Sequence, residues 1–215
     1  YYGFLGTEPF KSNKNKFNFW YVDEIQSLSM QRNPEKAPVC SLLCVSDIEN
    51  TCGLKNTFTV NICNANCTPH GYLFVKESFI GAPNAQQIRI MIHEFGHLLG
   101  LEDEYTVPNG ADAPGYPNCA PTREAAERWW GDLVGQEYEN LEVGYYQGCS
   151  LTEDNIRPTE SSIMRAASSP EIGFGPVNER HIREVLNEFS GEFSANIAER
   201  NLTQIFEERE SRRIG

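Results

Sequence analysis

The feature that most constrains the fold of this chain is the stretch 84–99, which reads NAQQIRIMIHEFGHLL. Its apolar residues recur three or four positions apart, which is the spacing of one face of an α-helix. Pro83 stands just before the stretch and Gly100 directly after it, and these residue types are typical of the beginning and the end of a helix. The sequence therefore predicts an amphipathic helix over 84–99.

This helix carries two histidines with the spacing of a metal chelate. His93 and His97 are four positions apart, so their directions differ by only about 40° and both rings can reach one ion. Glu94 lies about 100° from His93, where it can take a proton from metal-bound water. In zinc hydrolysis neutral imidazoles hold the ion, the ion lowers the pKa of water, and a carboxylate takes the proton. We therefore predict His93 and His97 as zinc ligands and Glu94 as the catalytic base.

The third ligand cannot be a histidine of the same motif. Gly100 can break the helix and let the chain turn back, which brings the residue six positions beyond His97 to the open side of the ion. That residue is Asp103, and it is the predicted third ligand.

Two other sources of the third ligand stay open at this point. Glu102 and Glu104 flank Asp103 but lack the six-residue spacing, and a later helix would supply Glu124 or Glu127, as in peptidases whose glutamate ligand follows the histidine pair at a distance. The early glycine stop favours Asp103. The two remaining histidines are interpreted as surface or core residues: His70 and His181.

Elsewhere the composition of short segments indicates the other elements. Segments rich in β-branched and aromatic residues predict three strands, at 17–25, 57–63 and 71–78. Capping residues and helical periodicity predict three further helices, at 122–135, 177–189 and 196–210. Strands followed by a central helix and then by loops and helices favour one α/β (α+β) domain over 1–215, with the sheet and active-site helix in 1–100 and a C-terminal subdomain in 101–215.

The net charge and the hydropathy of the chain limit the classes of partner that it can bind. Thirty acidic against 18 basic residues give a net charge of −12, which argues against nucleic acid because phosphate binding needs clustered Lys and Arg. No apolar window is long enough to span a membrane. Some acidic groups are candidates for calcium (Ca²⁺), but the twelve-residue EF-hand spacing is absent. Tyr1 does not resemble a translation start, so we expect a mature fragment.

The cysteine content indicates an oxidising compartment. Seven cysteines are many for a cytosolic protein of this size, so we expect a secreted, extracellular protein with disulfides and at least one unpaired thiol. Five fall between Cys40 and Cys67, where C-x-x-C spacing is absent and a zinc knuckle is therefore disfavoured. Cys119 and Cys149 stand apart from that cluster, and we expect them to form a bridge.

A methionine downstream supports the metal motif. The segment RPTESSIMRAAS (157–168) places Met164 after Pro158 and two serines, a turn-like context. The pattern H-E-x-x-H-x-x-G-x-x-H/D, matched from His93 to Asp103, resembles the zinc motif of the metzincin clan, in which a methionine in a tight turn packs beneath the metal. SSIM resembles that Met-turn.

The resemblance can be narrowed further. Five segments resemble the IgA-peptidase-type zinc metallopeptidases (metallopeptidase family sixty-four), a secreted bacterial metzincin family: HEFGHLLGLEDEY, EPFKSNKNKFNFWYV, YYQGC, IRPTESSIMR and FGPVNERHI. The likeness extends over 8–182, and the cysteine cluster departs from the family pattern. It implies bacterial-type export and a zincin fold with a twisted mixed sheet, a central active-site helix and a loop-rich, helical C-terminal part.

The implied activity is that of a zinc endopeptidase acting on a protein or peptide substrate; we expect a monomer. The implied site has His93, His97 and Asp103 as ligands, Glu94 as base and Met164 in the Met-turn. An extended substrate would pair with an edge strand of the sheet, for which 71–78 is the candidate.

Several aromatic residues have predicted roles at the site or in the core. Tyr145 and Tyr146 are candidates for oxyanion stabilisation, and Tyr105 for a wall of the site or a support of Asp103. Trp129 and Trp130 are interpreted as core residues.

The alternatives to an endopeptidase are a zinc amidase acting on cell-wall or small acylated peptides, and a metal-binding recognition module that does not hydrolyse. Glu94 argues against the second, because a structural site needs no carboxylate beside an open position.

Overall fold

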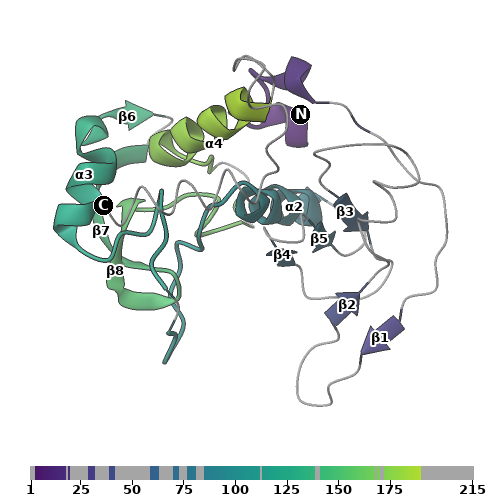
Figure 1. Cartoon of the computed structure of the whole chain (residues 1–215), viewed down its shortest axis with the longest axis horizontal. Coiled ribbons are helices and arrows are strands. Elements are labelled where there is room, and N and C mark those ends of the chain that lie inside the picture. Colours follow the sequence, from purple (N-terminus) through teal and green to yellow (C-terminus); the bar gives the residue numbers. More distant parts are fainter. Residues whose placement is uncertain are drawn as a thin grey trace.

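A computed structural model describes the following residues of the chain: 3–17, 19, 29–31, 39–41, 59–62, 70–72, 77–80, 85–111, 113–138, 141–167, 169 and 172–189. Within these residues, three α-helices and three small sheets give the mixed α and β content that was expected (Figure 1). None of the helices in the described part is long and apolar enough to cross a membrane.

The central helix α2 (Ala85–Leu98) confirms the predicted helix to within one residue at each end. Its apolar face is buried at Ile92, Phe95 and Leu98. The helix stops in a Schellman motif, in which Leu101 N donates to Gly96 O (3.1 Å) and Gly100 N donates to His97 O (2.9 Å). Gly100 has φ 88°, a conformation that glycine adopts without steric cost. The predicted chain reversal therefore occurs at Gly100.

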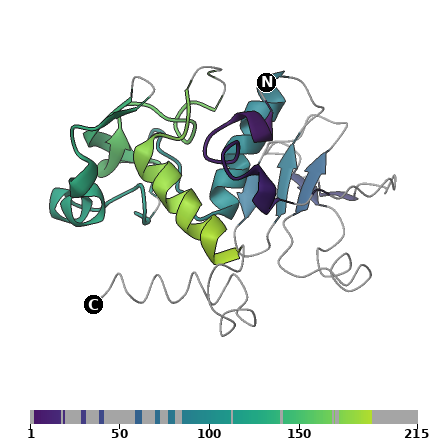
Figure 2. The ribbon, with the colours of Figure 1, turned by 90° about the horizontal axis from the view of Figure 1, so that it is seen from above.

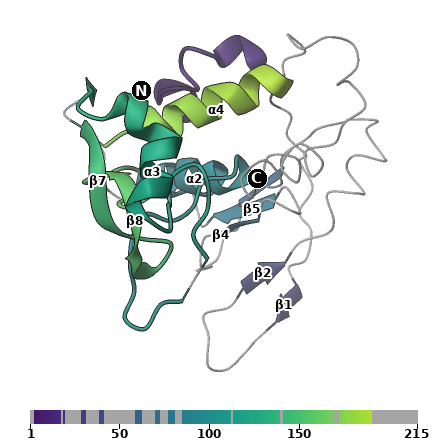
Figure 3. The ribbon, with the colours of Figure 1, turned by 60° about the vertical axis from the view of Figure 1, so that its left-hand side comes forward.

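A three-stranded mixed sheet packs against α2 (Figure 3). Its order is β3 (Thr59–Ile62), β5 (Glu77–Ile80), β4 (His70–Tyr72), with β3 parallel and β4 antiparallel to β5. A second, two-stranded sheet pairs β1 (Ser29–Gln31) with β2 (Val39–Ser41) in antiparallel fashion. Among the described strands, β4 is therefore at the edge of the sheet that α2 covers.

One of the three predicted strands is wrong, and another lies mostly outside the described residues. Strand β3 confirms the strand within 57–63, but the single strand predicted over 71–78 is wrong, because β4 ends at Tyr72 and β5 begins at Glu77. The residues between them carry no glycine, proline, Asn or Asp that would mark a reversal. In 17–25, Phe17 follows the 3-10 helix Lys14–Lys16 and neither Phe17 nor Phe19 is in a strand; the rest of that segment lies outside the described residues.

The C-terminal part contains a long β-hairpin that the sequence analysis missed. Strands β7 (Leu141–Cys149) and β8 (Thr152–Thr159) pair antiparallel, and β6 (Glu137–Tyr138) adds to β7. The expectation of a loop-rich, helical part was wrong here. The hairpin turns at Ser150–Leu151 rather than at the usual Asn-Gly, and register shifts in β7 break the alternation that would mark a strand.

The two remaining described helices match their predictions in place. Helix α3 (Arg123–Trp130) begins at the predicted cap, where Thr122 Oγ1 accepts from Ala125 N, but it ends earlier than predicted, in the 3-10 turn Gly131–Leu133. Helix α4 (Pro176–Phe189) confirms the prediction over 177–189. The helix predicted over 196–210 lies outside the described residues.

Helix α4 joins the two halves of the molecule. It lies between the N-terminal segment and the part that holds α3 and the hairpin (Figure 2). Arg183 is 4.0 Å from Glu8 on one side, and Arg180 forms a salt bridge of 2.7 Å with Asp132 on the other.

The described apolar side chains form two buried clusters. The first gathers α2, α4 and the segment around Met164: Phe10, Ile92, Phe95, Leu98, Leu99, Leu101, Ile163, Met164, Phe174, Ile182, Val185 and Leu186. The second lies under α3: Ala120, Ala125, Ala126, Trp130, Val143 and Val177.

Candidate metal centre

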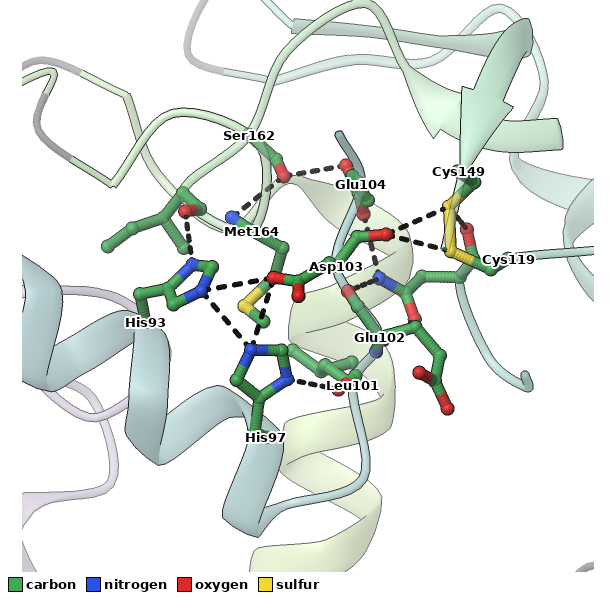
Figure 4. Close-up of polar contacts among 12 residues, drawn as sticks. His93, His97, Leu101, Glu102, Asp103, Glu104, Cys119, Cys149, Ser162 and Met164 are labelled. Atoms are coloured by element: carbon green, nitrogen blue, oxygen red, sulfur yellow. Dashed lines mark hydrogen bonds and ion pairs between the residues drawn. A yellow bond between two sulfur atoms is a disulfide. The ribbon is translucent and has the colours of Figure 1, made fainter. Parts of the chain in front are cut away.

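Two imidazole nitrogens of α2 face each other across the centre. His93 Nε2 and His97 Nε2 are 3.2 Å apart (Figure 4). Nδ1 of His93 lies 2.9 Å from Ile163 O, and Nδ1 of His97 lies 2.8 Å from Leu101 O. Because a carbonyl oxygen only accepts, each Nδ1 carries the proton and donates it, which leaves the Nε2 lone pairs free to bind an ion.

The chain reversal at Gly100 brings Asp103 to the same place. Its Oδ1 atom is 3.2 Å from His93 Nε2 and 3.2 Å from His97 Nε2. The structure thus brings the three predicted ligands together, and within the described residues this is the group of three His, Cys, Asp or Glu side chains suited to hold a metal.

The three atoms fit a zinc ion in both spacing and chemistry. Ligands about 2.0–2.2 Å from a tetrahedral zinc lie roughly 3.3 Å from one another, close to the 3.2 Å sides of this triangle. All three atoms are acceptors while the imidazoles are neutral, and buried Asp103 Oδ1 then has no donor, since its neighbours are the two Nε2 atoms. Buried acceptors that converge without a donor are costly unless a cation lies among them. A tetrahedral ion held by these three residues would keep its fourth position open.

The pKa shifts of His97 and Asp103 also show that this site favours positive charge. Burial lowers the pKa of His97, but the hydrogen bond and charge of Asp103 outweigh it and raise this pKa to about 9. Burial raises the pKa of Asp103, but the two histidines hold it well below its usual range. Protons therefore compete with a metal ion for these ligand atoms.

The predicted base lies beside the centre. Glu94 is only 6% exposed. Its negative charge contributes to the raised pKa of both His97 and Tyr105, which places its carboxylate near the two. Burial is the largest cause of the raised pKa of the Tyr105 phenol, followed by the charge of Asp103 and a hydrogen bond to it. That bond agrees with the predicted role of Tyr105 as a support for Asp103.

The acidic neighbours of Asp103 do not join the metal centre. Glu102 exchanges two backbone hydrogen bonds of 2.9 Å with the side chain of Asn118. Glu104 is fully buried and turns away from the histidines. Its Oε1 accepts from Asn118 (3.0 Å) and Asn178 (2.8 Å), and its Oε2 accepts from Ser162 (2.6 Å). Sequence reasoning considered Glu104 only as a substitute ligand and missed this network, because its partners are distant in the chain.

The network also holds the turn that contains Met164. Glu104 N donates to Met164 O (3.0 Å), and Met164 N donates to Ser162 Oγ (3.1 Å). The Met164 side chain is buried next to the two histidines (Figure 4). A Cβ added at Gly96 would meet Met164 Sδ at 2.6 Å and Phe174 at 3.1 Å. The glycine between the two histidines therefore lets this turn pack against α2.

The other candidate residues have different surroundings. Glu124 and Glu127 are exposed on α3, and the hydroxyl of Tyr145 donates to Glu127. The Tyr146 hydroxyl donates to Glu142 O at 3.4 Å. Neither Glu124 nor Glu127 belongs to the three-ligand group.

Two core interpretations can also be checked. Trp130 is fully buried, as expected of a core residue, and Trp129 is half-buried. His181 is buried with Nε2 2.8 Å from Leu99 O, so it packs against the end of α2. His70 lies in β4.

The predicted disulfide lies directly behind Asp103. Cys119 and Cys149 are bonded, which confirms the expected bridge. Their sulfurs lie 3.3 and 3.5 Å from the backbone oxygen of Asp103. The cluster between Cys40 and Cys67 lies almost entirely outside the described residues.

Comparison with known proteins adds no relative. No family model matches the chain, and no curated protein does. The chemistry of the centre therefore has to be argued from its geometry.

Proposed function

We propose that this chain is a secreted zinc-dependent endopeptidase of the metzincin type. The observation that carries the proposal is the convergence of three acceptor atoms, with 3.2 Å between each pair, beside the buried carboxylate of Glu94. Two imidazoles and one carboxylate are a typical zinc donor set, and three protein ligands with an open position are typical of catalytic rather than structural sites. Zinc held there would lower the pKa of a water molecule and polarise the scissile carbonyl.

The residues of the chain divide the remaining work. Glu94 takes a proton at its carboxylate and passes it to the nitrogen of the leaving amine. Hydrogen bonds from Nδ1 of both histidines to backbone carbonyls keep the Nε2 lone pairs directed at the centre. Tyr105 orients the carboxylate of Asp103.

Two features of the fold support the metzincin assignment, and with it the resemblance to the IgA-peptidase-type family. The glycine turn after α2 returns the chain to the third ligand, and the Met164 turn packs against the helix at Gly96. The mixed sheet beside α2 supports it as well.

The substrate would pair with β4. This strand is antiparallel to β5 and is at the edge of the described sheet next to α2. An edge strand offers unpaired backbone groups to an extended peptide. The cleft would therefore select an extended backbone first and side chains second.

The decisive experiment compares wild type with Glu94→Gln on a denatured protein mixture and maps the new N-termini. The exposed Glu124→Gln on α3 is the matched control, since it makes the same chemical change away from the centre. We expect cleavage within chains by wild type and the control, and none by Glu94→Gln, with zinc bound in all three. Glu94-dependent hydrolysis of small acylated peptides alone would indicate the amidase instead. Zinc binding without hydrolysis would indicate the recognition module.

A further inference from the structure

The turn between β7 and β8 has an unusual backbone. Cys149 pairs with Thr152, so the turn has two residues, and both have positive φ: 48° at Ser150 and 63° at Leu151. Such turns normally use Asn-Gly, because glycine has no Cβ and Asn tolerates positive φ better than most other residues. A strained conformation of this kind persists only where the surroundings hold it.

The surroundings in this case are the segment that carries the third metal ligand. Ser150 N donates to Asp103 O at 2.7 Å, and Leu151 N donates to Tyr105 O at 3.0 Å. Val107 N donates in return to Leu151 O at 3.2 Å. Leu151 thus forms a parallel β-bridge with Thr106, and Ser150 adds a separate backbone hydrogen bond to Asp103.

The disulfide reinforces the same contact. Both sulfurs of Cys119–Cys149 touch the Asp103 carbonyl oxygen that accepts from Ser150 N. Figure 4 shows the disulfide on the side of Asp103 away from the histidines. The Ser150 side chain is 1% exposed and donates to Ala113 O at 2.7 Å. The Asp103 peptide is therefore held from behind by three atoms of the hairpin and its bridge.

We propose that this arrangement, the hairpin clamp (Ser150, Leu151 and the Cys119–Cys149 disulfide), positions Asp103 and so sets the metal affinity of the centre. The inference rests on the metal site of the proposed function. His93 and His97 are positioned by α2 itself, whereas Asp103 follows the end of the helix and has no regular element of its own. The orientation of such a ligand depends on the groups that contact it.

The test measures zinc affinity by competition with a chromogenic chelator, independently of any turnover. Cys119→Ser with Cys149→Ser should bind zinc about 10- to 100-fold more weakly than wild type, the usual effect of removing groups that support a ligand. Leu151→Gly removes the leucine side chain and Leu151→Val shortens it, but β-branched valine disfavours positive φ and glycine does not. We expect the valine variant to bind zinc roughly tenfold more weakly than the glycine variant.

Val143→Ala is the matched control for lost stability. Val143 lies in β7 and packs in the second core cluster. We expect it to lower Tm without changing zinc affinity. If the cysteine variant and Leu151→Val lower Tm in the same way while their zinc affinity stays at the wild-type value, the clamp is only structural and the inference is overturned. The pair at position 151 decides the question if the cysteine variant does not fold.

The same zinc-affinity measurement also tests the metal site itself. If wild type bound no zinc, or Asp103→Ala bound it as tightly as wild type, the centre itself would be refuted and the clamp with it. Tight binding that depends on Asp103 but not on the clamp would refute the clamp alone.

Discussion

The proposed metal centre draws its candidate ligands from two regions that are built differently. His93 and His97 share one continuous helix, so the period of α2 places both rings on one side. Asp103 lies beyond the helix end and is held by residues far along the chain: Cys119, Cys149, Ser150 and, through its neighbour Glu104, Asn118, Ser162 and Asn178. The positions of two candidate ligands therefore depend on a local segment, and the position of the third depends on the folded C-terminal part.

The largest expected effects come from removing one ligand of each kind. His97→Ala and Asp103→Ala should both abolish turnover, because each leaves the ion with two protein ligands. Circular dichroism should show α2 retained in both. Stoichiometric zinc bound with wild-type affinity by either variant would remove that residue from the centre.

Glu104→Gln tests the C-terminal region without touching a ligand. The amide would place a donor against Ser162 or against the amides of Asn118 and Asn178, and a buried polar group without a partner costs about 1–3 kcal/mol. We expect a loss of this size in urea unfolding with EDTA present. Glu102→Gln is the control on the other side of Asp103, where a change below about 0.5 kcal/mol is expected. Equal losses in the two variants would contradict the special place of Glu104.

Gly96→Ala tests the helix region. The added methyl would lie 2.6 Å from Met164 Sδ, and inserting a methylene into a packed core costs typically about 1–3 kcal/mol. We expect a value at the lower end, because the methionine side chain can shift. Thermal unfolding measures it, and Met164→Ala should relieve the clash in the double variant. An unchanged Tm in Gly96→Ala would mean that the turn does not pack there.

The stability of the metal-free protein should also depend on pH. Asp103 and Glu94 raise the pKa of His97 to about 9 against the opposing effect of burial. A raised pKa stabilises the fold fully below the unfolded value of about 6.5, and the stabilisation is lost as pH rises through the folded value. With EDTA, Tm should therefore fall between about pH 6.5 and 9. Asp103→Asn should flatten this slope, and a slope unchanged in that variant would show that another group causes it.

Features that depend on interactions between residues close in sequence were predicted correctly, and most features that depend on distant residues were not. The helix over 84–99 and its stop at Gly100 were predicted because periodicity and capping are local signals. The Cys119–Cys149 bridge was predicted because those two cysteines stand apart from the cluster. The hairpin was missed because Ser150–Leu151 lacks turn residues and is held by tertiary hydrogen bonds. Strand 71–78 failed because composition does not reveal where a strand pair reverses.

The candidate donor set, the histidine pair on one helix face and the glycine that returns the chain toward Asp103 can all be read from the local sequence. These follow from helix geometry, which acts over a few residues. Only the tertiary structure decided that Glu104 serves a buried network instead of the metal, and that a strained turn and a disulfide stand behind Asp103. The reason is physical: side chains 14 to 74 residues from Glu104 satisfy its carboxylate, and no local pattern encodes such distances.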